Sequence, residues 1–265
     1  MSFLDIFLYA LLPIFVMMSI LWIISVIIKN VSIVDIFWGF GFVLTTWFYY
    51  FFTDGYELRK LLISILVTIW GLRLSIYIAW RNAFKGEDFR YRNFRKKYGE
   101  KHYWWISFFQ VFLLQGILMW LISSPLLGAQ YYNRNNNLNL FDYIGLIVWI
   151  TGLVFEAGGD LQLAKFKANP ANKGKILDTG FWRYTRHPNY FGDSAVWWGY
   201  GLLSCAAGGY LAALGSILMT LLIIKVSGVA MLEKSLKTKR EGYEEYVKRT
   251  SAFFPWFPRK NKNSS

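Results

Sequence analysis

Long apolar segments constrain the fold of this chain more than any other feature. Of its 265 residues, 55% are hydrophobic and 17% are charged. A helix that crosses a bilayer needs about 20 mostly apolar residues. Seven such segments, the sixth of them short, predict an all-α polytopic membrane protein with seven transmembrane helices. We place these helices at 6–28, 32–52, 61–80, 106–123, 141–164, 192–206 and 211–231.

The basic residues alternate with these segments. Of the 29 Lys and Arg residues, 24 follow this pattern. They are Lys29 and the basic residues of the connections 81–101 and 165–186 and of the tail after residue 231. The exceptions are Arg59, Lys60, Arg73, Arg134 and Lys225. Cytoplasmic loops of membrane proteins carry an excess of Lys and Arg. Seven helices with the N-terminus outside and the C-terminus in the cytoplasm place every basic segment on one side.

Several other classes of protein and site are disfavoured. Because membrane orientation explains where the positive charges lie, the net charge of +13 does not indicate a nucleic-acid partner. Cys205 is the single cysteine, which excludes an internal disulfide and disfavours a thiolate metal site, so we expect no metal. The sequence contains no Walker pattern and no strand-associated Gly-rich motif. We therefore expect one membrane domain, 1–231, and a cytoplasmic amphipathic tail, 232–265.

The stretch from 176 to 200 combines chemistry-bearing residues with the start of an apolar segment. Pro188 turns the chain after His187, so a helix can open near Asn189 with Asp193 in its first turn. Arg183 and Arg186, three residues apart, could present two guanidinium groups to a phosphate-bearing ligand. The alternative is a cytoplasmic loop whose basic residues only set the membrane orientation.

Acidic residues at membrane depth are costly and usually face an interior cavity. Asp35 begins the second segment; a protonated Asp35 could donate to a carbonyl oxygen, or it could be an interfacial acid that complements the helix dipole. Glu156 and Asp160 lie on one helix face, where two carboxylates need a polar or cationic group between them. Ribose hydroxyls or an adenine amine would serve, as would the nearby Lys165.

The tail predicts a short amphipathic helix with Tyr243 and Tyr246, followed by an aromatic segment limited by Pro255 and Pro258. Such a tail can close over a cytoplasmic cofactor site. It can equally be a surface helix that anionic lipid holds.

Three motifs together resemble the steroid 5-alpha-reductase-like superfamily, most closely its bacterial branch, a family of unknown function numbered 1295. They are the run Arg-His-Pro-Asn-Tyr-Phe-Gly-Asp at 186–193, the acid pair of Glu156 and Asp160, and the Gly-Tyr-Glu-Glu-Tyr and Phe-Pro elements of the tail. The resemblance spans 32–258. It implies a seven-helix enzyme that reduces an activated carbon–carbon double bond with NADPH, in a hydrophobic, steroid-like or lipid-like substrate that enters from the bilayer.

The resemblance also implies that six residues match positions that contact the dinucleotide: Glu156, Asp160, Lys167, Asn189, Tyr190 and Asp193. Arg186 and His187 fit the variant shared with the sterol C14-reductase branch. The candidate cofactor-binding residues are Glu156, Asp160, Lys167, Arg183, Tyr184, Arg186, His187, Asn189, Tyr190, Asp193, Arg240 and Tyr246. The candidate catalytic residues, which would polarise the substrate carbonyl, are Asp35, Trp70 and Tyr77. The sequence departs from the steroid reductases here, because it lacks their Gln-Glu pair and has Trp70 where they carry a tyrosine.

Two other functions share some of these features. Isoprenylcysteine and phospholipid methyltransferases, which use S-adenosylmethionine, carry a similar Arg-His-Pro element. They also carry a Glu-Glu pair after the last helix, whereas here Glu233 is followed by Lys234. A non-catalytic lipid-binding protein is the third alternative, against which the polar cluster speaks. The resemblance to the bacterial branch predicts a bacterial inner membrane.

Overall fold

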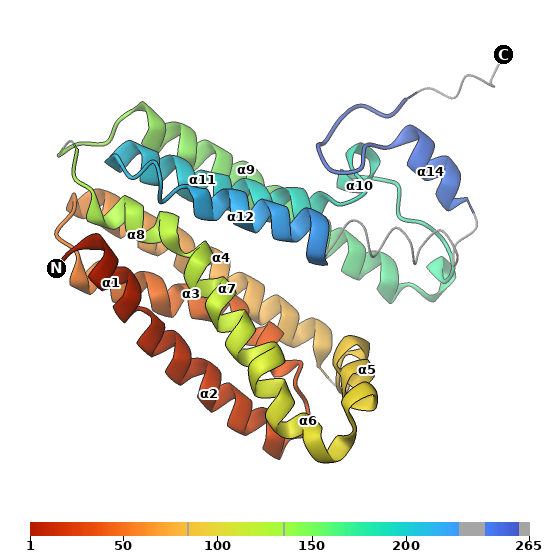
Figure 1. Ribbon diagram of the computed structural model, residues 1–265. Coiled ribbons are helices and arrows are strands. Elements are labelled where there is room, and N and C mark those ends of the chain that lie inside the picture. The colour runs from red at the N-terminus through yellow and green to blue at the C-terminus, as the bar shows by residue number, and fades with distance from the viewer. Residues whose placement is uncertain (84, 135, 228–241, 260–265) are drawn as a thin grey trace. The chain divides into compact units, whose positions relative to one another are not determined.

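The computed structural model describes residues 1–83, 85–134, 136–227 and 242–259 (Figure 1). Within these ranges the regular elements are helices, and the one β feature is an isolated parallel bridge between Thr185 and Ser251. The all-α fold expected from the apolar segments is therefore confirmed for the described residues.

The chain divides into two compact units. Unit 1 comprises Met1–Asn139 and Leu203–Gly215, and unit 2 comprises Leu140–Leu202 and Ser216–Ser265. The first part of unit 1 contains α1 (Phe3–Tyr9), α2 (Leu11–Ile27), α3 (Ile33–Phe52), α4 (Glu57–Asn82), α5 (Phe89–Tyr98), α6 (Glu100–Ser107), the π-helix η1 (Phe108–Leu113), α7 (Leu114–Ile122) and α8 (Ser124–Tyr131). The remaining helices are α9 (Leu140–Ala168), the short 3-10 helix η2 (Pro170–Asn172), α10 (Phe181–Tyr184), α11 (Pro188–Ala207), α12 (Leu214–Leu222), the π-helix η3 (Ile223–Ser227) and α14 (Tyr243–Arg249).

Five helical segments of the described chain are long and apolar enough to cross a membrane. They are Phe3–Ile27, Ile33–Phe52, Glu57–Asn82, Glu100–Tyr131 and Leu140–Ala168. They overlap the first five predicted spans, and Glu100–Tyr131 extends well beyond the predicted bounds 106–123 at both ends. A multi-pass membrane protein is thus supported.

The sixth and seventh predicted spans are not among these five segments. α11 has 20 residues, but Asn189, Asp193 and several small residues lower its hydropathy. Of the last predicted span, 211–231, the structure describes residues up to 227, and the apolar helical part within them is Leu214–Lys225. The seven-span count therefore remains a prediction.

The core of unit 1 forms around the closely packed pair α3 and α4. Gly39 and Gly71 face each other, and a Cβ added at Gly71 would lie only 2.5 Å from the carbonyl oxygen of Gly39. This approach brings the fully buried rings of Phe42 and Trp70 to a centroid distance of 5.9 Å. Packing of small residues replaces the hydrophobic effect as the force that joins helices in lipid.

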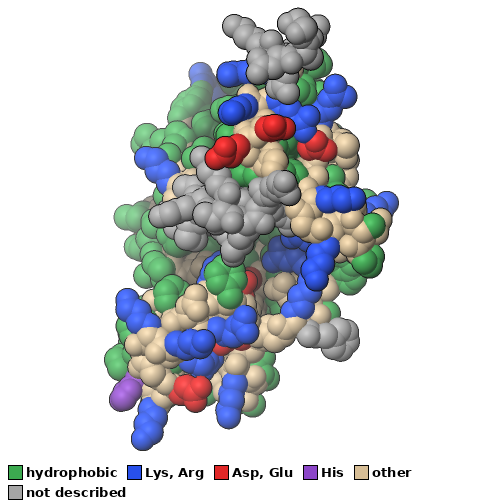
Figure 2. All heavy atoms as spheres, turned by 90° about the vertical axis from the view of Figure 1, so that its right-hand side faces the viewer, with side chains coloured by type: hydrophobic (Ala, Val, Ile, Leu, Met, Phe, Trp, Pro, Cys, Tyr) green, Lys and Arg blue, Asp and Glu red, His purple; other side chains and the backbone are tan. Residues whose placement is uncertain are grey.

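Two basic connections of unit 1 meet at one end of these helices. The backbone N–H of Val31, just after Lys29, donates to Glu87 at 2.9 Å, and the N–H of Asp88 donates to the hydroxyl of Ser32 at 2.6 Å. Figure 2 shows the face of the molecule that includes this end, and Lys and Arg side chains are spread over it. The connections around Lys29 and 81–101 therefore lie together at this end of unit 1.

Unit 2 is organised by the contact between α9 and α11. A Cβ at Gly152 would lie 2.5 Å from the backbone nitrogen of Val196 and 2.6 Å from the carbonyl oxygen of Gly192. A Cβ at Gly199 would meet the Cβ of Trp149 at 2.7 Å. Because these positions carry no side chain, the two backbones approach closely and hold the polar start of α11 against the end of α9.

Candidate functional site

The candidate cofactor residues of unit 2 gather where the last turns of α9 meet the first turn of α11. A Cβ added at Gly159 would lie 3.1 Å from the ring of Pro188 and 3.2 Å from the backbone nitrogen of Asn189. The indole N–H of Trp182 donates to the carbonyl oxygen of Gly159 at 3.1 Å, which ties the connecting segment to the same turn. Residues separated by about 30 positions in the sequence therefore lie side by side.

The acid pair lies on the buried face of α9. The exposed fractions of Glu156 and Asp160 are 3% and 7%. The Asn189 amide donates to Asp160 Oδ1 at 3.2 Å, and Asn189 Oδ1 accepts from the backbone N–H of Tyr190 at 3.1 Å. Asp193 lies one turn farther along the same face of α11. The structure thus joins Asp160 to Asn189, a contact between two of the candidate residues.

The element around His187 is ordered by local contacts. The backbone N–H of His187 donates to the hydroxyl of Thr185 at 3.2 Å, and its imidazole stacks on the ring of Tyr190 with centroids 5.5 Å apart. His187 is buried, with 4% of its surface exposed. α11 starts at Pro188, next to the predicted start at Asn189, but the prediction that Asp193 lies in the first turn is wrong, because a helix that starts at Pro188 puts Asp193 in its second turn.

Lys167, Arg183 and Tyr184 are exposed. Lys167 belongs to the last turn of α9, and Arg183 and Tyr184 belong to the one-turn helix α10. The carbonyl oxygen of Tyr184 accepts from the backbone N–H of Trp256 at 2.9 Å. These three side chains are exposed on the segments that follow the acid pair in the sequence.

Arg186 does not face solvent beside Arg183, as the three-residue spacing of the two arginines suggested. Its side chain is buried, and its Nη1 donates to the carbonyl oxygens of Val247 at 3.1 Å and Thr250 at 2.6 Å. Arg183 and Arg186 therefore do not form two solvent-facing forks, because one of them binds the end of α14.

The C-terminal tail packs along the segment 178–186. Thr185 pairs with Ser251, the N–H of Arg186 donates to Ser251 O at 2.9 Å, and the Thr185 hydroxyl donates to Phe253 O at 2.8 Å. The phenol of Tyr246 donates to the carbonyl oxygen of Trp182. Burial raises the pKa of Tyr246, so this phenol is neutral and acts as a hydrogen-bond donor.

An ion pair adds to this tail contact. Arg249 binds the carboxylate of Asp178, and neither residue was predicted from the sequence. No periodicity or motif marks this pair, because it joins the end of α14 to an irregular segment 71 positions earlier in the sequence. The remaining candidate, Arg240, lies outside the described residues.

The three candidate catalytic residues belong to unit 1. Trp70 is fully buried in α4 beside Phe42, and Tyr77 lies two turns along the same helix, with its ring 6.0 Å from that of Trp80. Asp35 is in the first turn of α3. The α3–α4 pair therefore carries all three side chains.

The partners of Asp35 were not predicted. The Arg90 Nη2 donates to Asp35 Oδ2 at 2.7 Å, and the phenol of Tyr91 donates to Oδ1 at 2.7 Å. Asp35 is thus the acceptor of an ion pair and not an isolated acid. Burial raises the pKa of Tyr91, as does the adjacent Asp35 carboxylate. Burial alone would lower the pKa of Arg90, but the Asp35 carboxylate raises it above its ordinary value.

The polar side chains of the candidate site in unit 2 suit a ligand that has both hydroxyl and phosphate groups. The carboxylates of Glu156 and Asp160 and the amide oxygen of Asn189 are acceptors for hydroxyl or amine groups. The exposed Lys167 and Arg183 supply the positive charge that phosphate oxygens require. A nucleotide cofactor combines both kinds of group.

Comparison with known proteins identifies a family and several relatives of this chain. A model of the family described as "Protein of unknown function (DUF1295)" matches residues 21–250. An uncharacterized protein of Schizosaccharomyces pombe is 25% identical over 277 residues, which cover 94% of this chain and 79% of that protein. No solved structure matches the chain.

Two further relatives match shorter parts. A Delta(14)-sterol reductase of Ascobolus immersus is 28% identical over 153 residues, which cover 52% of this chain and 34% of the reductase. A probable O-methyltransferase of Ustilaginoidea virens is 39% identical over 67 residues, which cover 25% of this chain and 22% of that protein. The matching relatives are fungal, so they lend no support to a bacterial source. Since the family model covers most of the chain, this protein belongs to the DUF1295 family of proteins of unknown function.

Proposed function

We propose that this protein is an integral-membrane reductase that uses NADPH to reduce an activated carbon–carbon double bond in a hydrophobic, steroid-like or lipid-like substrate. The observation that carries the proposal is the buried Asp160 carboxylate bonded to the Asn189 amide beside the Arg-His-Pro element. The similarity to a sterol reductase over 153 residues supports the same class of enzyme.

The residues of unit 2 would bind the cofactor. Glu156, Asp160 and Asn189 would accept hydrogen bonds from ribose hydroxyls or the adenine amine, and Lys167 and Arg183 would face the phosphates. A bound nicotinamide supplies the hydride. Arg186 and Tyr246 act indirectly in this proposal, because they tie the tail to the segment that ends at His187.

The substrate would lie among the helices and be polarised by residues of unit 1. We propose that Asp35 and its donor Tyr91 hold the proton that a reduced enone must receive at its carbonyl oxygen or α-carbon. Trp70 and Tyr77 would contribute one N–H and one O–H donor. A hydrophobic substrate that enters from the bilayer suits a site within membrane helices.

The membrane arrangement belongs to this proposal as well. We propose seven spans, with the N-terminus outside, the C-terminus in the cytoplasm and the tail closing over the cofactor site. Lys29 and the connection 81–101 share one end of unit 1, which supports a common cytoplasmic side. The bacterial inner membrane remains a prediction from the sequence resemblance alone.

Calorimetric titration of the protein in nanodiscs tests the cofactor. We expect NADPH to bind with micromolar affinity, and Asp160→Asn to weaken it at least about tenfold, since a hydrogen bond to a charged group contributes about 1.5–3 kcal/mol. Glu244→Gln is the matched control, because Glu244 is an exposed acid of α14. Oxidation of NADPH with a panel of enones then tests turnover.

Other outcomes of the titration would contradict the proposal. Binding of S-adenosylmethionine without NADPH would make the protein a membrane methyltransferase, the class to which the shorter 67-residue match points. Equal loss of binding in Asp160→Asn and Glu244→Gln would remove Asp160 from the site.

A further inference from the structure

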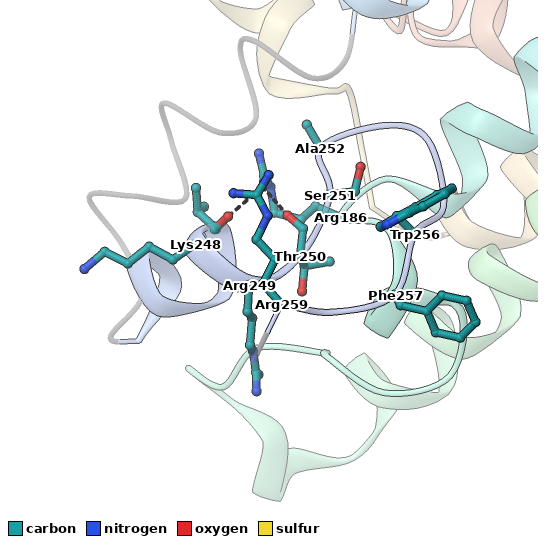
Figure 3. Close-up of a pocket in the computed structure, with 10 residues that line it drawn as sticks. Arg186, Lys248, Arg249, Thr250, Ser251, Ala252, Trp256, Phe257 and Arg259 are labelled. Carbon is teal, nitrogen blue, oxygen red and sulfur yellow. Dashed lines mark hydrogen bonds between the residues drawn. The ribbon is translucent and has the colours of Figure 1, made fainter. Parts of the chain in front are cut away.

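The tail borders an open cavity that the proposed reaction does not use. Its volume is about 330 Å³, and it lies between the end of α14 and the irregular segment that follows (Figure 3). Its lining includes four basic residues and two aromatic ones, which are Arg186, Lys248, Arg249, Arg259, Trp256 and Phe257.

The lining of this cavity is strongly basic. Four of its residues are Lys or Arg, and none is acidic. Asp178 pairs with Arg249 from outside the lining. The guanidinium of Arg186 donates to the carbonyl oxygens of Val247 and Thr250 and is held in the wall of the cavity, so Lys248 and Arg259 supply the further positive charge (Figure 3). The cavity therefore favours an anion, and guanidinium groups suit phosphate in particular.

Two large aromatic side chains, Trp256 and Phe257, line the same cavity, and Phe254 belongs to the same segment. The exposed fractions of Phe254, Trp256 and Phe257 are 70%, 73% and 77%. Clustered exposed aromatic residues are unusual on a surface that faces only water, whereas Trp is enriched at the level of lipid headgroups. Exposed aromatic residues beside basic ones are the arrangement of an interfacial membrane anchor.

We propose that this cavity binds the phosphate of an anionic phospholipid headgroup, while Trp256 and Phe257 insert beside its acyl chains. The tail would thereby be fixed to the membrane surface, on the side where its packing holds the segment 178–186. This inference does not depend on the proposed reductase activity.

Native mass spectrometry of the full-length protein in detergent tests the proposal. The probes are dioctanoyl phosphatidylglycerol and dioctanoyl phosphatidylcholine, and the readout is the apparent dissociation constant of each lipid. We expect the anionic lipid to bind more tightly than the zwitterionic one. Lys248→Gln with Arg259→Gln should weaken binding of the anionic lipid at least about tenfold, because each basic residue near an anionic lipid contributes about fivefold to the affinity. Arg259 is held by its backbone N–H, which donates to Arg249 O at 2.9 Å, so this substitution spares that contact.

A second double variant keeps the test specific. Lys96→Gln with Lys97→Gln removes the same charge from the exposed surface of α5 and should leave the affinity unchanged. Equal affinity for the two lipids, or equal loss in both double variants, would overturn the proposal. Displacement of the lipid by inorganic phosphate or by NADP⁺ at matched concentration would also overturn it, since the site would then serve a free anion or the cofactor.

Discussion

At the scale of single residues, the contacts of Asp35 change how this acid is interpreted. One carboxylate in the first turn of α3 accepts from both Arg90 and Tyr91, at 2.7 Å each. Arg90 also donates its Nε to Asp88 at 3.0 Å. Asp35 could therefore serve catalysis, or it could simply hold the start of α5 against α3.

The substitution Asp35→Asn distinguishes these roles when it is paired with Arg90→Gln. Both variants break the same ion pair, and because Arg90 is 43% exposed, each should cost only about 1 kcal/mol of stability. If Asp35 supports proton transfer, Asp35→Asn lowers turnover at least about 100-fold, whereas Arg90→Gln retains most of it. NADPH titration should show unchanged cofactor binding in both variants.

A parallel loss would contradict the catalytic role of Asp35. If Asp35→Asn and Arg90→Gln reduce turnover and thermal stability by the same amount, the ion pair is structural. Loss of NADPH binding in Asp35→Asn would give the same conclusion.

At the scale of elements, the glycine contact between α9 and α11 determines where the acid pair lies. Gly152 and Gly192 let the backbones touch, and Glu156 is one turn from Gly152 on the same face. Small residues at such a crossing are typical of helix pairs in membranes. The position of Asp160 against Asn189 depends on this approach.

We predict that Gly152→Val separates α9 from α11. The new side chain would begin 2.5 Å from the backbone nitrogen of Val196, and backbone cannot move aside as a flexible side chain can. The expected destabilisation is about 3 kcal/mol, together with loss of NADPH binding. Thermal unfolding in detergent measures it, and Thr151→Val, at the adjacent exposed position, is the control. Similar unfolding midpoints for the two variants would exclude the close contact.

At the scale of the whole molecule, the charge distribution should determine the orientation in the membrane. Lys and Arg flank the predicted spans on one side, and the exceptions at Arg59, Lys60 and Arg134 flank them on the other. Orientation follows this bias when the loops are short.

Labelling of single cysteines tests the orientation. In a Cys205→Ala background, a membrane-impermeant maleimide added to intact cells should label Asn136→Cys and should label Lys97→Cys only after permeabilisation. The opposite pattern would invert the predicted orientation, and labelling of both in intact cells would place the two positions on the same side.

The sequence by itself determined the fold class, because a run of about 20 apolar residues has few stable states other than a membrane helix. It also indicated the helix start at Pro188 and the shared face of Glu156 and Asp160, since both follow from local backbone geometry. Helix ends such as those of α4 and α9 were less predictable, because a helix can continue past its apolar part.

Only the tertiary structure decided which side chains meet. The Asp35–Arg90 pair joins residues 55 positions apart, and the Arg186–Thr250 hydrogen bond joins residues 64 positions apart. Neither contact leaves a periodic signal, because each depends on how separate helices and loops pack. For the same reason, the sequence marked Arg186 as a phosphate ligand, whereas the packing of the tail made it the residue that holds α14 in place.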